Sequence, residues 1–104
     1  MLLEEYRKFT ESMLIEREPI NKNSERAAYL ALGLVGEAGE VSELIKKMLR
    51  DGKLDVRDLQ LELGDVFYYF ITLADLYGIS LGEIMLQNVK KLTQRRERGT
   101  LVRR

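Results

Sequence analysis

The chain has 104 residues, of which 45% are hydrophobic and 33% charged, a composition typical of one folded globular domain spanning residues 1–104. Its 17 basic and 17 acidic residues cancel, but residues 90–104 hold seven basic residues and one acidic residue, so residues 1–89 carry a net charge of −6. The absence of cysteine and histidine excludes disulfides, thiolate nucleophiles, zinc sites built on sulfur or imidazole, and His-based catalytic triads.

The sequence predicts helices and no strands. In residues 2–14 apolar side chains recur with helical spacing, and residues 16–23, which include Pro19, predict a connecting loop. Ser24 would cap a second helix over about residues 25–50, which Asp51-Gly52 would end.

A third and a fourth helix follow. Asp55 would open the third helix, which we expect to end at Tyr77-Gly78, and a capping box of Ser80 and Glu83 would open a fourth that continues to about Arg98. Residues 66–71 are apolar or aromatic on nearly every side, so this stretch needs packing partners on every side. In a chain this small, that requirement favours a second subunit and predicts an oligomer.

The main functional clue is a pair of carboxylates in the second helix. At about 100° per residue, Glu37 lies near the middle of a broad apolar stripe, and Glu40 lies about 60° to one side on the same face. The third helix repeats the arrangement, with Glu62 inside an apolar stripe and Asp65 three residues later. If both helices face one core, four carboxylates converge there.

Such a cluster needs positive charge. An unpaired buried carboxylate costs several kcal/mol, whereas the net stability of a whole domain is only about 5–15 kcal/mol. Salt bridges to Lys or Arg of neighbouring helices are one solution. A bound metal ion is the other, and four carboxylates without a soft ligand favour a hard cation, Mg²⁺ first and Mn²⁺ second.

Glycines accompany the first carboxylate pair. Gly33, Gly36 and Gly39 lie on a flank of the carboxylate face, although each costs up to about 1 kcal/mol relative to Ala in a helix. Their spacing predicts either a close approach of another backbone or a ligand, or a frayed or kinked helix. Tyr69, near the carboxylates on the third helix, would either pack in the core or stack on a base.

The fourth helix adds polar groups of the opposite sign. Asn88, Lys91 and Arg95 share one helical face, and the apolar members of that face are Leu81, Ile84, Met85 and Leu92. If this face points inward, its cations and a carboxylate-bound metal would together clamp a polyphosphate. The reaction class would be metal-assisted hydrolysis, in which water attacks phosphorus.

Three motifs in this order carry a family resemblance. Glu37-Ala38-Gly39-Glu40, then Glu62-Leu63-Gly64-Asp65, then Asn88, Lys91 and Arg95 resemble the MazG-like nucleotide pyrophosphohydrolases of the all-α NTP pyrophosphatase superfamily, over roughly residues 28–99. The resemblance implies a four- to five-helix antiparallel bundle whose core is completed by dimerisation, as a homodimer or a dimer of dimers.

The resemblance also implies an activity. Such enzymes cleave nucleoside triphosphates between the α and β phosphates, giving the monophosphate and pyrophosphate, a role in nucleotide-pool housekeeping. The catalytic residues, which would also bind Mg²⁺ or, as a second choice, Mn²⁺, would be Glu37, Glu40, Glu62 and Asp65. Phosphate or ribose would be bound by Asn88, Lys91 and Arg95.

Two alternatives stay open. The basic tail, residues 95–104, would let a helical dimeric adaptor bind nucleic acid, although it has no aromatic residue to stack on bases. Alternatively, the enzyme would act on another pyrophosphate-linked nucleotide such as phosphoribosyl-ATP. No signal-peptide pattern and no apolar run of about 18 residues is present, so we expect a cytoplasmic protein without a membrane partner.

Overall fold

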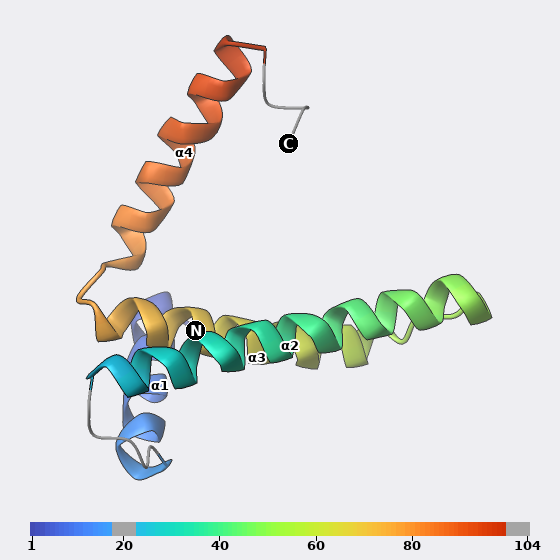
Figure 1. The fold of residues 1–104 in the computed structure, drawn as a ribbon, viewed down its shortest axis with the longest axis horizontal. Coiled ribbons are helices and arrows are strands. Elements are labelled where there is room, and N and C mark those ends of the chain that lie inside the picture. Colours follow the sequence, from blue (N-terminus) through green and yellow to red (C-terminus); the bar gives the residue numbers. More distant parts are fainter. Residues whose placement is uncertain (18–22, 100–104) are drawn as a thin grey trace.

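The computed structural model describes residues 1–17 and 23–99, and within these ranges the fold is all-α (Figure 1). Four helices follow one another along the chain: α1 (Leu3–Arg17), α2 (Asn23–Asp51), α3 (Val56–Leu76) and α4 (Leu81–Glu97). The described part contains no strand, so the all-α class predicted from the sequence is confirmed. Most of the predicted loop, including Pro19, lies outside the described residues, as does the end of the basic tail from Thr100 onward.

Helices α2 and α3 form a long antiparallel hairpin, the main packed unit of the chain (Figure 1). Gly52, with φ of +74°, lets the chain leave α2, and the Asp55 side chain then accepts hydrogen bonds from the backbone N–H groups of Arg57 and Asp58. The Asp55 cap is therefore confirmed. Ser24 is not an N-cap, because α2 already begins at Asn23.

The connection from α3 to α4 is a defined corner. Gly78 has φ of +66°, and the N–H groups of Gly78 and Ile79 donate to the carbonyls of Asp75 and Ala74, which is the Schellman arrangement. The Ser80 hydroxyl then accepts from the Glu83 N–H, as the predicted cap requires. The bend between the two helix axes is 102°.

Because of this corner, α4 projects away from the other helices (Figure 1). Extended packing is found between α2 and α3 and, to a smaller extent, between α1 and α3. One chain by itself therefore does not form the antiparallel bundle that we expected to include the last helix. The expected inward face of α4 is not covered within the chain, since Met85 is 56% exposed and Leu92 39% exposed.

The core is small. Among the described residues, the fully or nearly buried hydrophobic side chains are those of Leu30, Ile71 and Ala74. Thr10 and Thr72 are also buried, and their hydroxyls donate to backbone carbonyls one turn earlier in their own helices. Helix α1 is held against α3 by the stacked rings of Tyr6 and Phe67, whose centroids are 5.4 Å apart.

An ionic contact reinforces the same helix pair. The Arg7 guanidinium on α1 contacts the Asp75 carboxylate on α3 at 3.3 Å, and it also pairs with Glu4 and Glu11 on its own helix.

No single described helix is both long and apolar enough to cross a membrane. The bent pair of α3 and α4 meets the length and composition criteria only when the two helices are taken together.

Candidate metal centre

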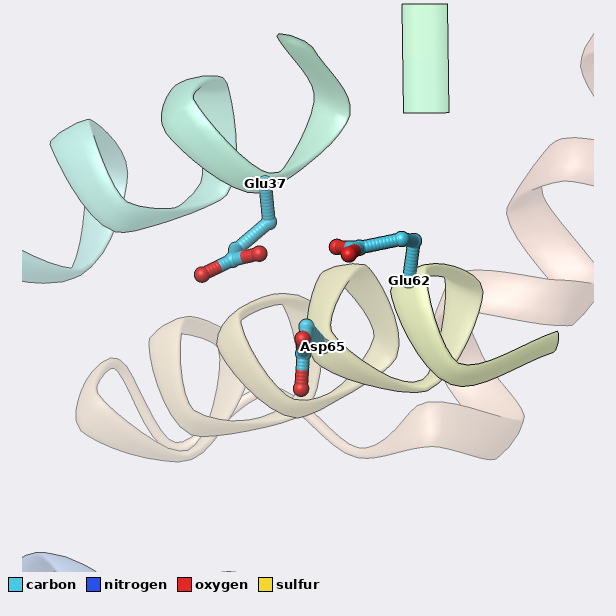
Figure 2. A group of neighbouring side chains, drawn as sticks. All are labelled: Glu37, Glu62 and Asp65. Carbon is cyan, nitrogen blue, oxygen red and sulfur yellow. The ribbon is translucent and has the colours of Figure 1, made fainter. Parts of the chain in front are cut away.

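Three of the four carboxylates predicted from the sequence meet where α2 faces α3. Glu37 extends from α2 toward α3, and Glu62 and Asp65 come from successive turns of α3 (Figure 2). One oxygen of each carboxylate can be chosen so that all three atoms lie within 4.8 Å of one another. The i, i+3 spacing on α3 places two of these groups on one side of that helix, and the hairpin brings the third to them.

Burial and the neighbouring negative charges both raise the pKa of Glu37. Partial burial of this carboxylate, followed by the negative charges of Asp65, Glu62 and Glu40, raises its pKa above the ordinary value of 4.5. Among the side chains that the structure describes, no Lys or Arg forms an ion pair with Glu37, Glu62 or Asp65. The salt-bridge solution considered from the sequence is therefore absent from this part of the chain.

The donor set fits a hard divalent cation. Carboxylate oxygens are the ligands that Mg²⁺ and Mn²⁺ prefer. With metal–oxygen distances of about 2.1 Å, ligand oxygens around Mg²⁺ are separated by up to about 4.2 Å. The chosen oxygens of Glu37, Glu62 and Asp65, which lie within 4.8 Å of one another, are close to that spacing.

Glu40 lies outside this triplet. Its side chain is exposed on α2, and its negative charge contributes to the raised pKa of Glu37. Its role in catalysis or metal binding stays a prediction.

A pocket of about 560 Å³ opens beside the carboxylates. Glu37 and Asp65 line it together with aromatic and apolar side chains from α1 and α3: Tyr6, Phe9, Met13, Leu61, Tyr68 and Tyr69, with Gln60 and Gly64 completing the wall. Burial and the charge of Asp65 raise the pKa of the Tyr6 hydroxyl. The sequence interpretation did not include the α1 residues, although the spacing of Tyr6, Phe9 and Met13 on one helical face was a usable signal.

The Tyr69 ring packs against the α2 backbone at Gly33. A Cβ atom added to Gly33 would overlap this ring, so one of the predicted glycine positions does permit a close approach. A Cβ on Gly36 or Gly39 would meet no atom within 4 Å. Burial, Tyr29 and then Glu37 raise the pKa of Tyr69, which both packs between the helices and lines the pocket.

The polar residues of α4 lie elsewhere in the single chain. Asn88 and Lys91 are exposed and line a separate pocket of about 330 Å³ with Ile79, Glu83, Ile84 and Gln87. Arg95 is half-buried further along the helix. One chain therefore does not bring these three residues to the carboxylate triplet, and their role in binding phosphate or ribose stays a prediction.

Comparisons with known proteins identify the same family as the three sequence motifs do. A family model described as the MazG nucleotide pyrophosphohydrolase domain matches residues 25–100. The Gene 37 protein of Mycobacterium phage L5 is 42% identical to the chain over 82 residues, which cover 74% of the chain and 72% of the phage protein. No solved structure matches significantly. The matched region contains both carboxylate pairs and all of α4, and on this basis the chain belongs to the family of MazG nucleotide pyrophosphohydrolases.

Proposed function

We propose that the protein is a Mg²⁺-dependent nucleoside triphosphate pyrophosphohydrolase that releases the nucleoside monophosphate and pyrophosphate. The observation that supports this most is the meeting of Glu37, Glu62 and Asp65 next to a pocket walled by aromatic rings, where no ion pair to a basic side chain is found within residues 1–17 and 23–99. Membership of the MazG family supports the hydrolase class, and the site residues support the choice of metal and substrate.

The pocket and the carboxylates would bind opposite ends of a nucleotide. The rings of Tyr6, Phe9 and Tyr68 offer apolar faces on which a base can stack, a contact worth about 1–3 kcal/mol per base in nucleic-acid complexes. The triphosphate would then extend toward Glu37 and Asp65, which line the same pocket. Without a cation, four negative substrate charges would meet three carboxylates, so binding requires the metal.

Glu37, Glu62 and Asp65 would hold the ion, which when bound would neutralise phosphate oxygens and make a water molecule more acidic. The raised pKa of Glu37 means that ion binding must displace a proton from it over part of the acidic pH range. Glu40 lies one helical turn further along α2 and outside the triplet, which leaves its carboxylate for orienting the attacking water and accepting its proton.

The test is to identify products from a panel of normal and modified nucleoside triphosphates, with phosphoribosyl-ATP included, in the presence and absence of Mg²⁺. We expect monophosphate and pyrophosphate only with the metal, and a loss of kcat/KM on the order of 100-fold or more in Glu62→Gln. Glu43→Gln is the matched control, because Glu43 is exposed on α2 and is not part of the triplet. Turnover that survives both Glu62→Gln and Asp65→Asn would reject the assigned site.

We also infer a homodimer or a dimer of dimers acting in the cytoplasm. The apolar side chains exposed on α2, α3 and α4 support the first part of this inference, since Leu32, Val56 and Val89 are each at least 60% exposed. The location remains an expectation from the sequence.

A further inference from the structure

The hydroxyl of Tyr6 is a polar group of the pocket that neither the metal site nor the base contact uses. Tyr6 lies on α1 and lines the pocket of about 560 Å³ together with Phe9 of the same helix and Asp65 of α3. We propose that this hydroxyl binds a hydroxyl group of the substrate's sugar, so that Tyr6 sets the preference among ribose, deoxyribose and dideoxyribose nucleotides. The inference rests on the proposed function, because it takes a nucleotide as the ligand of this pocket.

Tyr6 lies close to both parts of the pocket to which the ends of a nucleotide are assigned. Its ring centroid is 6.1 Å from that of Phe9, which offers a face to the base. The negative charge of Asp65 raises the pKa of the Tyr6 hydroxyl, so the phenol is also near this carboxylate of the metal site. In a nucleotide the sugar joins the base to the α-phosphate. A nucleotide that reaches both Phe9 and the metal site therefore carries its sugar past Tyr6.

The Tyr6 hydroxyl has no partner in the part of the chain that the structure describes. Within residues 1–17 and 23–99 it makes no hydrogen bond to another protein group. An ordinary phenol, with a pKa of about 10, is protonated at neutral pH and can both donate and accept. A sugar hydroxyl also donates and accepts, which makes it a matching partner for this group.

Packing fixes the direction of the Tyr6 side chain. One face of its ring is stacked on Phe67 of α3, with the centroids 5.4 Å apart and an angle of 21° between the planes. Phe67 in turn stacks on Phe70, with centroids 6.1 Å apart. The next residue of α1, Arg7, is tied to Asp75 of α3 by the ion pair at 3.3 Å. A group held in this way can discriminate among ligands, because a rotation that moved the hydroxyl would break the aromatic stack.

Two other polar side chains of the pocket are less suited to the sugar. A hydrogen bond with Tyr29 is among the causes that raise the pKa of Tyr69, so the Tyr69 hydroxyl already has a partner. Gln60 is exposed, and at about 100° per residue its side chain leaves α3 about 140° away from that of Asp65. It lines the same pocket without sharing the position of Tyr6 beside the metal site, which makes it a useful comparison.

Tyr6→Phe tests the proposal, because it removes the hydroxyl and keeps the ring that stacks on Phe67. The substrates are four triphosphates of one base, with ribose, 2′-deoxyribose, 3′-deoxyribose and 2′,3′-dideoxyribose as the sugar. We expect kcat/KM to fall about 2–13-fold for the substrates that carry the bound hydroxyl, as for the loss of one neutral hydrogen bond. The dideoxy substrate should be unaffected, and the two singly deoxygenated substrates show which hydroxyl is bound.

The controls distinguish a sugar contact from a structural role. Gln60→Leu removes a polar group from the same pocket and should leave the ratios among the four substrates unchanged. Tyr6→Phe should bind Mn²⁺ and unfold as the wild type does, since it loses no hydrogen bond within the described residues. The proposal is overturned if Tyr6→Phe lowers kcat/KM equally for all four substrates or for none, if it weakens Mn²⁺ binding, or if Gln60→Leu shows the selective loss instead.

Binding measurements separate this proposal from the proposed function. A wild type that hydrolyses the triphosphates, with the same sugar preference in Tyr6→Phe, would keep the proposed function and reject the sugar contact. A wild type that hydrolyses none would reject the proposed function. Equilibrium dialysis of a nucleoside monophosphate and its 2′,3′-dideoxy analogue would then still measure the contact. Weaker binding of the analogue to the wild type, but not to Tyr6→Phe, would support the sugar contact, whereas equal binding or no binding would reject it.

Discussion

Replacing Gly33 by alanine probes the contact on which the α2–α3 hairpin and the pocket both depend. A Cβ at this position would lie 2.6 Å from both Cδ1 and Cζ of Tyr69, well inside van der Waals contact, and closer still to Cε1. The ring is part of the packed surface between the helices and lines the pocket, so it has to move. Gly39, on the same helix, is the matched control, because a Cβ added there would meet no neighbouring atom within 4 Å.

The two substitutions should change stability in opposite directions. Alanine is favoured over glycine in a helix by about 1 kcal/mol, and Gly39→Ala should gain most of that amount. At Gly33 the same gain is set against overpacking, which typically costs about 1–3 kcal/mol, so the net result is a loss of up to about 2 kcal/mol. For a chain of about 100 residues, each kcal/mol shifts the melting temperature by about 4–8 °C.

Thermal and urea unfolding at one fixed protein concentration would measure the difference, since the stability of the proposed oligomer would depend on concentration. The Tyr69→Leu background removes the obstructing ring, and Gly33→Ala should there become neutral or stabilising, which a double-mutant cycle would report as coupling. A Gly33→Ala protein as stabilised as Gly39→Ala would refute the close approach.

Three further predictions concern charge and substrate. Without metal, Glu37→Gln should be more stable than the wild type at neutral pH. The folded-state pKa of Glu37 is raised, so the stability that the wild type has below about pH 4.5 is lost as the pH rises through that pKa. Unfolding curves of the two proteins should therefore differ at neutral pH and converge at low pH. Arg7→Met should lower the melting temperature more than Arg50→Met, because Arg7 joins α1 to Asp75 of α3 whereas Arg50 pairs with its neighbour Asp51; equal shifts would argue against the α1–α3 tie. Phe9→Ala should raise KM for a nucleoside triphosphate by about 5–150-fold, while the KM for inorganic tripolyphosphate as substrate should not change, if the ring stacks on the base.

Local features of the fold followed from the sequence because their causes are local. The caps at Asp55 and Ser80 and the end of α3 at Gly78 depend on residues within a few positions of one another. The i, i+3 spacing also placed Glu62 and Asp65 together on one side of α3, whereas the same spacing on α2 did not bring Glu40 into the triplet. Glu37, Glu62 and Asp65 were all among the predicted residues.

Features that depend on contacts between distant parts of the chain could not be predicted from the sequence. Periodicity shows that α4 has an apolar face but not which surface covers it, and the corner at Gly78 and Ile79 turns that face away from the hairpin of its own chain. The spacing of Tyr6, Phe9 and Met13 marks one face of α1, but it does not show that this face lies beside the carboxylates, which depends on the long-range packing of Tyr6 on Phe67. Glycine spacing likewise did not show which of three glycines would meet a ring.

The most direct measurement is the binding of Mn²⁺ to the metal-free protein, followed by calorimetry or by the paramagnetic signal of the free ion. We expect saturable binding at the carboxylate triplet that is weakened at least about tenfold in Glu62→Gln and in Asp65→Asn, and that Mg²⁺ competes away. Glu43→Gln should bind as the wild type does. Equal affinity in all four proteins, or no binding in any of them, would contradict a metal site at these carboxylates.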